Sequence, residues 1–145
     1  MILLCIIFGN KYLFQKDKIT FLDVGQGDST IIQTYDGYTY VVDTGGTFQT
    51  PLGRNTGTYD VLPYLQKEGI SKIDGLFITH MDKDHCLGAI ELFDQIEIGG
   101  IYISNYAFEK TPLSETFFKN ANKYHIPIYT IETGENAQLG QNMFL

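Results

Sequence analysis

The sequence has little of several residue types that mark specialised classes of protein. It contains two cysteines, four prolines and no tryptophan in 145 residues. Cys5 and Cys86 could form at most one bridge, which excludes a scaffold held together by disulfides. Basic residues are also scarce, with ten Lys and Arg against seventeen Asp and Glu. The resulting net charge of −7 argues against a surface that coats nucleic acid non-specifically, but not against a local site that binds phosphate through metal.

Long hydrophobic runs are missing too, apart from the uniformly apolar residues Met1–Phe8. This run is too short to cross a bilayer, which takes about 20 residues. It also lacks the basic start and small-residue cleavage site of a signal peptide. Two interpretations stay open, a buried strand or the end of a longer transmembrane helix, with lysines following as they do beside a membrane edge. We therefore separate residues 1–18, as an N-terminal apolar segment, from a domain over residues 19–145.

What the sequence does contain is enough apolar material for one globular domain. Hydrophobic residues make up 43% and charged residues 19% of the chain, and a domain of this size buries roughly two-thirds of the surface of its unfolded chain. Residues 19–24, 29–34 and 38–42 are rich in β-branched and aromatic residues, which favours strands. The Asp36-Gly37 turn between the last two predicts a hairpin, and the three strands together predict an antiparallel meander.

After residue 59, strand patterns alternate with helix patterns. Apolar strands are expected at residues 73–78, 100–104 and 128–131. The helices between them are expected to begin at an Asp60 N-cap, near Leu87, and at Thr111-Pro112, with the last running to Pro127. A meander followed by alternating strands and helices predicts an α/β (α+β) sandwich.

The residues with the clearest chemistry follow the strand at 73–78. His80, Asp82, Asp84 and His85 are potential metal ligands within six residues. Alternate residues of an extended segment point the same way, so His80 and Asp82 could share one metal. Asp84 and His85 could share a second metal only if the chain is already turning into a helix. Two metals about 3.5–4 Å apart can bind a phosphate and activate a water. The alternative is a solvated polar loop after a buried strand.

This cluster carries a resemblance to a known family. His80-Met81-Asp82-Lys83-Asp84-His85 resembles the H-x-[HD]-x-D-H signature of the metallo-β-lactamase superfamily. The signature here has aspartate at its third position and is preceded by Phe21-Leu22-Asp23-Val24-Gly25-Gln26-Gly27-Asp28-Ser29. This combination resembles the soluble domain of the ComEC competence proteins, which are membrane proteins associated with DNA uptake. Val42–Gly46 and Asp60–Leu65 resemble two further motifs of that family, so the resemblance runs from about residue 19 to residue 93.

The resemblance implies a metallo-β-lactamase-like αββα sandwich and a role for each site residue. His80 and Asp82 would bind one metal, and Asp84 and His85 the other, with Asp84 as the catalytic residue that orients the attacking water. Asp43 would orient a ligand from behind. Aspartate in place of histidine at position 82 moves the expected metal from zinc toward manganese, with zinc still open.

Two motifs of the family do not occur between Glu91 and Leu145: a later aspartate in a Thr-Gly-Asp-like segment and a later histidine in a His-His-Gly-Ser-like segment. We therefore expect only the first half of the sandwich, without the half that would cover its sheet. The two divalent ions, Mn or Zn, are then expected to bind weakly to this segment. Arg54, in the long loop from residue 43 to residue 59, is either a contact for a substrate phosphate or an ordinary solvated arginine. Cys86 is either a small helix residue or a redox-sensitive thiol.

Three functions follow from these expectations. The leading one is a metal-dependent hydrolase domain that acts on phosphodiesters, with DNA as partner, in a membrane-associated uptake protein. The second is a truncated, non-catalytic module that packs on a membrane channel or another partner. The third is a hydrolase for small esters or lactams. We expect this segment itself to be soluble and to contact the membrane only through flanking parts of a longer protein, on a side that the sequence does not indicate. A second copy of the chain, or the rest of a longer one, is a further expected partner.

Overall fold

The computed structural model describes residues 16–46, 55–104, 110–132, 134–140 and 143–144. The apolar run at residues 1–8, Cys5 and Arg54 therefore lie outside the described residues. Within the described ranges, no helix is long and apolar enough to cross a membrane.

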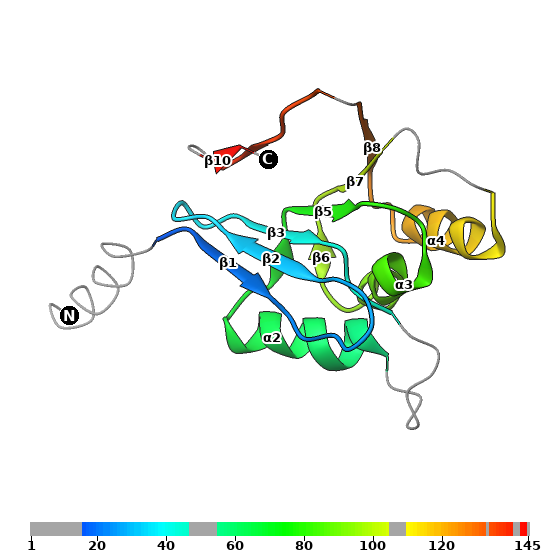
Figure 1. Ribbon diagram of the computed structural model, residues 1–145, viewed down its shortest axis with the longest axis horizontal. Helices are drawn as coiled ribbons and strands as arrows, with labels where there is room; N and C mark the ends of the chain where they lie inside the picture. Colours follow the sequence, from blue (N-terminus) through cyan, green and yellow to red (C-terminus); the bar gives the residue numbers. More distant parts are fainter. Residues whose placement is uncertain (1–15, 47–54, 105–109, 133, 141–142, 145) are drawn as a thin grey trace, which may run out of the picture.

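One mixed sheet of six strands organises the chain (Figure 1). Its order is β1-β2-β3-β5-β7-β8, and the bounds are β1 (Lys18–Phe21), β2 (Thr30–Gln33), β3 (Thr39–Val42), β5 (Gly75–Ile78), β7 (Ile101–Ser104) and β8 (Ile128–Ile131). The first three strands pair antiparallel and the last three join them in parallel. The meander predicted from the sequence is confirmed, and Gly37 closes its hairpin with φ of 94° and an N–H donated to the Thr34 carbonyl.

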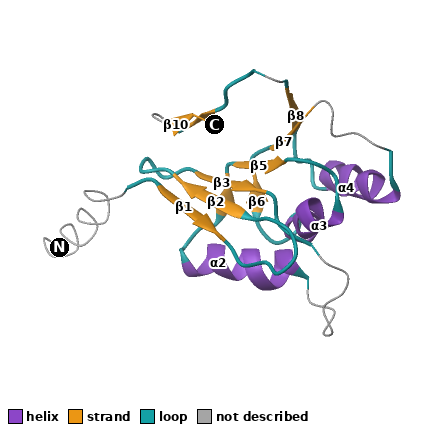
Figure 2. Cartoon of the chain, in the orientation of Figure 1, coloured by secondary structure: helices purple, strands orange, loops and turns teal. Residues whose placement is uncertain are grey.

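The helical segments pack against one face of this sheet, as Figure 2 shows for α2 and α3. They are η1 (Gly57–Val61), α2 (Leu62–Lys67), α3 (Lys83–Leu92) and α4 (Pro112–Lys123). Two short strand pairs complete the fold, β4 (Lys72–Ile73) with β6 (Glu97–Ile98) and β9 (Gln138–Leu139) with β10 (Met143–Phe144). The main core lies between sheet and helices and includes Ile31, Val41, Leu76, Ile101 and Phe117, all fully buried. The predicted α/β class is confirmed.

The other face of the sheet carries a row of aromatic side chains. The ring of Phe77 lies 6.3 Å from that of Tyr40 and 4.8 Å from that of Tyr102, which in turn lies 5.1 Å from Tyr129. Leu139, from β9, is buried against this face. Phe21, at the edge of the same face, remains 80% exposed. Among the described residues this face is therefore covered only in part.

Three boundaries differ from those that the sequence predicted, and the first concerns Asp60. The helix begins at Gly57, so Asp60 lies within it and is not its N-cap. The carboxylate of Glu91 on α3 accepts a hydrogen bond from the Thr58 N–H at 3.1 Å. A backbone N–H of the first turn is thus bonded by Glu91, which is distant in sequence, and not by a local N-cap side chain.

The other two differences lie at Asp74 and at the end of α4. The strand expected over residues 73–78 is broken at Asp74, whose Oδ2 accepts a hydrogen bond from the Thr39 N–H at 2.8 Å. Helix α4 ends at Lys123, before Pro127, because His125 adopts a left-handed conformation with φ of 56°. Its start at the Thr111 cap is confirmed, with a reciprocal capping box to Ser114.

Candidate functional site

The predicted metal ligands and Asp43 gather where β3 and β5 end. These two strands are parallel neighbours, so the segments that follow them emerge at the same edge of the sheet. Asp43 follows β3, and Thr79 and His80 follow β5, whose residues are all buried. The chain then turns at Asp82 into α3, which places Asp84 and His85 in the first helical turn. This is the turn into a helix that convergence of Asp84 and His85 required.

Asp43 is the most buried of the site residues, at 2% exposure. Its Oδ1 accepts the Thr79 N–H at 2.9 Å, and its Oδ2 accepts the Thr79 hydroxyl at 2.6 Å. The same Oδ2 lies 2.8 Å from His85 Nδ1. Asp43 also has φ of 54°, a left-handed conformation that Asp tolerates better than most residues. The contact with His85 is the one that the predicted orienting role requires, while the role itself stays a prediction.

The two histidines lie side by side, with 3.7 Å between their ring centroids. His80 Nδ1 lies 2.9 Å from the Thr79 hydroxyl oxygen. The other nitrogen of each ring faces a carboxylate: His80 Nε2 lies 3.6 Å from Asp82 Oδ2, and His85 Nε2 lies 3.9 Å from Asp84 Oδ2. His80 thus lies beside Asp82 and His85 beside Asp84, and the two imidazole rings are in contact. That each pair binds one metal stays a prediction.

These donors have the chemistry of a site for a divalent ion but not a complete set. Imidazole nitrogen and carboxylate oxygen are ligands for zinc and manganese. In the described part of the chain, however, no three His, Cys, Asp or Glu side chains are placed so as to hold one ion. A catalytic zinc site ordinarily uses three protein ligands. The arrangement therefore offers two adjacent pairs of donors, each short of a full site.

Two glycines lie so close to the first turn of α3 that neither has room for a Cβ atom. A Cβ on Gly27, which has φ of 99°, would lie 1.8 Å from the Asp84 carbonyl oxygen. A Cβ on Gly46, with φ of 153°, would lie 2.1 Å from the Lys83 carbonyl oxygen. The Thr44 N–H adds a hydrogen bond to the His85 carbonyl at 2.8 Å. The turns at residues 25–28 and 43–46 therefore pack directly on the backbone that carries Asp84 and His85.

Cys86, next to His85, is a packing residue. It is fully buried in the core between the sheet and α3. Burial, and then the negative charge of Asp43, raises the pKa of its thiol to about 12. A thiol that stays protonated and inaccessible is a poor nucleophile. Of the two interpretations, the structure favours the small helix residue.

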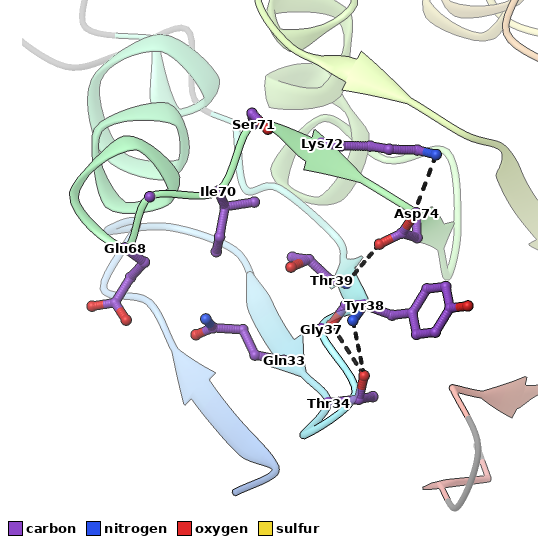
Figure 3. Close-up of a pocket in the computed structure, with 11 residues that line it drawn as sticks. Gln33, Thr34, Gly37, Tyr38, Thr39, Glu68, Ile70, Ser71, Lys72 and Asp74 are labelled. Atoms are coloured by element: carbon purple, nitrogen blue, oxygen red, sulfur yellow. Dashed lines mark hydrogen bonds and ion pairs between the residues drawn. The ribbon is translucent and has the colours of Figure 1, made fainter. Parts of the chain in front are cut away.

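A separate polar pocket of about 350 Å³ lies at the opposite end of β5 (Figure 3). Thr39, Lys72 and Asp74 line it, and Asp74 bonds to the Thr39 N–H and pairs with Lys72 at 3.6 Å. Of the predicted site residues that the structure describes, none lines this pocket. It is therefore not part of the candidate site.

Sequence reasoning missed Thr79. Its hydroxyl joins Asp43 to His80, with contacts of 2.6 and 2.9 Å. The available signal was its position, since it is the residue between the buried strand and the first histidine.

The chain is similar in sequence to several known proteins. The family model described as "Metallo-beta-lactamase superfamily" matches residues 22–141. The chain is 26% identical over 143 residues to ComE operon protein 3 of Bacillus subtilis (strain 168), covering 91% of this chain and 18% of that protein. It is 39% identical over 72 residues to Recombination protein 2 of Haemophilus influenzae (strain ATCC 51907 / DSM 11121 / KW20 / Rd), covering 50% of this chain and 8% of that protein.

A third relative is Competence protein ComA of Neisseria gonorrhoeae, 32% identical over 90 residues, which cover 62% of this chain and 12% of that protein. The chain thus spans less than a fifth of the length of each of these relatives. Among solved structures, the DIM-1 metallo-β-lactamase exposed to ceftazidime superposes with a TM-score of 0.44 and 21% identity, over 86% of this chain and 55% of that one.

Proposed function

Because the chain belongs to the metallo-β-lactamase superfamily, we propose that it is part of a metal-dependent hydrolase domain that acts on phosphodiesters, with DNA as substrate. The observation that carries the proposal is the pairing of potential metal ligands. Two imidazole rings lie with their centroids 3.7 Å apart, and an aspartate lies near the Nε2 of each ring. The names of two relatives, a competence protein and a recombination protein, favour DNA over a small ester or lactam.

The proposal gives each site residue a role. His80 and Asp82 would hold one divalent ion, and Asp84 and His85 a second. Asp84 would also orient the attacking water. When bound, such ions polarise the phosphate and lower the pKa of a bound water, which supplies the nucleophile. Asp43 would keep His85 in one orientation through the 2.8 Å contact to its Nδ1.

The oxygen-rich donor set bears on the identity of the ion. Two of the four proposed ligands are aspartates, and carboxylates favour manganese more than imidazoles do. Asp82 is the more accessible of the two, with 78% of its side chain exposed. On the ground of these carboxylates we propose manganese first and zinc second. Ligands arranged only in pairs predict weak binding of either ion. We propose that the remaining ligands are supplied by segments outside this chain.

We also propose a place for the domain in a larger protein. Since the chain covers less than a fifth of each relative, the remaining segments could supply both membrane attachment and a basic track for DNA. The −7 charge of this chain fits that division, because bound cations would neutralise Asp82 and Asp84 while other segments contact the DNA backbone.

The test is manganese-dependent cleavage of DNA by a longer form of the protein that contains this segment. His80→Ala and Asp84→Ala should each abolish cleavage, since each removes a ligand from a different pair. Asp94→Ala, which removes an exposed carboxylate just after α3, is the control and should cleave as the unchanged protein does. Cleavage that persists in both the His80 and the Asp84 variant would contradict the proposal.

A second candidate is a non-catalytic module that packs on a partner. It is favoured by the lack of any three metal-binding side chains around one point in the ranges that the structure describes. A longer protein that binds neither manganese nor zinc at this site would support it and would exclude the hydrolase.

A further inference from the structure

The hydroxyl group of Thr79 contacts two polar groups at once. It lies 2.6 Å from Asp43 Oδ2 and 2.9 Å from His80 Nδ1. A hydroxyl has a single hydrogen to donate and can also accept. A carboxylate oxygen only accepts, so the Thr79 hydrogen goes to Asp43. The hydroxyl oxygen must then accept from His80, which requires the proton of that ring to be on Nδ1.

His85 is constrained by the same carboxylate, but directly. Its Nδ1 lies 2.8 Å from Asp43 Oδ2, so it donates to that oxygen. The ring proton of a neutral His85 is therefore on Nδ1, and its Nε2 carries a free lone pair. Both rings end up in the same protonation pattern, one through direct contact and the other through a hydroxyl.

We propose that Thr79 is a positioning residue that holds His80 in the Nδ1–H tautomer by relaying a hydrogen bond from Asp43. One buried carboxylate then sets the tautomer of both histidines. As a result, both Nε2 atoms carry a free lone pair, and they lie 3.6 and 3.9 Å from Asp82 Oδ2 and Asp84 Oδ2. An unprotonated nitrogen is what a metal ligand must offer.

This inference deepens the proposed function, because it names the group that prepares His80 for a metal. Its test uses the metal-free chain and measures no activity, so the two proposals can fail separately. Thr79 is itself exposed, and β5 before it is fully buried. Substitutions at position 79 therefore leave the core packing intact.

The experiment is two-bond ¹H–¹⁵N correlation NMR of the histidine rings in the metal-free 145-residue chain. The pH is raised until the ring signals no longer change, so that the neutral rings are observed. His80 and His85 should both show the pattern of the Nδ1–H tautomer. The ring signals of His80 and His85 are compared with those of His125, an exposed histidine just after α4, as an internal reference.

Two variants separate the relay from the general structure of the site. Thr79→Val keeps the shape of the side chain and removes the hydroxyl, so His80 should leave the pure Nδ1–H state while His85 keeps it. Thr79→Ser restores a hydroxyl and should restore the His80 pattern. An Nε2–H tautomer of His80 in the unchanged chain, or a His80 pattern that is the same in Thr79→Val, would overturn the proposal. Should Thr79→Val fail to fold, the spectrum of the unchanged chain still decides between these outcomes.

Discussion

Replacing Asp43 with asparagine should destabilise the fold more than any other isosteric change of a carboxylate in the site. Asp43 is 2% exposed and accepts three hydrogen bonds, from the Thr79 N–H, the Thr79 hydroxyl and His85 Nδ1. Asparagine keeps the shape and one acceptor oxygen, which can still bind the Thr79 N–H. Its NH₂ group, however, replaces the oxygen that accepts from the hydroxyl and from His85.

The magnitude follows from those two lost bonds. A hydrogen bond to a charged group contributes about 1.5–3 kcal/mol. Two such bonds give an upper range of about 3–6 kcal/mol, and rotation of the hydroxyl to accept from the new NH₂ recovers part of it. We expect a loss of about 3 kcal/mol. Asparagine tolerates the left-handed backbone at φ of 54°, so conformational strain adds little.

The assay is urea denaturation of the two chains, with the free energy of unfolding compared at equal slope. Asp82→Asn is the matched control, because Asp82 carries the same functional group but is 78% exposed. It should change the free energy of unfolding by less than about 0.5 kcal/mol. A loss below about 1 kcal/mol for Asp43→Asn would refute the assigned role of the buried carboxylate.

Three further outcomes follow from the packing. Gly27→Ala should cost at least about 2 kcal/mol more than Gly37→Ala in urea denaturation; both have positive φ, but only at Gly27 would a Cβ meet backbone, 1.8 Å away, and equal losses would contradict this. Phe117→Ala, at a fully buried ring, should cost about 3–5 kcal/mol, and a loss near 1 kcal/mol would argue against the core. In a Cys5→Ser background, Cys86 should resist iodoacetamide at pH 8 until urea unfolds the chain, because burial raises its pKa to about 12. Since the unfolded thiol ionises near 9.0, the free energy of unfolding should also fall as pH rises above that value, and rapid labelling of the folded chain would contradict both.

The pairing of His80 with Asp82 could be read from the sequence because it depends on local geometry. His80 and Asp82 lie two residues apart at the end of a strand, so their spacing places them on one side. Asp84 and His85 are adjacent, and their pairing depended on a turn into a helix that the spacing left open. The relation between the two pairs could not be read in this way. It depends on where the first turn of α3 lies relative to β5, and Gly27, which is distant in sequence, packs directly on that turn.

Dependence on distant residues also explains why two predicted element boundaries were wrong. Asp60 has the sequence signature of an N-cap, but the helix begins earlier, at Gly57. There the Thr58 N–H is bonded by Glu91, 33 residues further along the chain. The break in the strand at Asp74 also depends on a tertiary bond, to Thr39. In each case a long-range hydrogen bond overrides a local preference, and a local pattern contains no information about it.

The aromatic face of the sheet bears on the expectation that this chain is half of a sandwich. Contacts between the rings of Tyr40, Phe77, Tyr102 and Tyr129 span four strands. Such a surface is unusual for a sheet that faces water, where polar residues alternate with buried ones. It is the kind of surface on which the second half of the sandwich would pack, and that arrangement stays a prediction.

The most direct test of the site is the response of the three histidines to manganese. Mn²⁺ is paramagnetic and broadens the NMR signals of the ring that it contacts, even when it binds weakly. Titrating Mn²⁺ into the ¹⁵N-labelled chain should broaden His80 and His85 together and before exposed His125, since the first two lie 3.7 Å apart beside Asp82 and Asp84. Broadening of all three histidines at the same concentration, or of His125 first, would contradict a metal site at the end of β5.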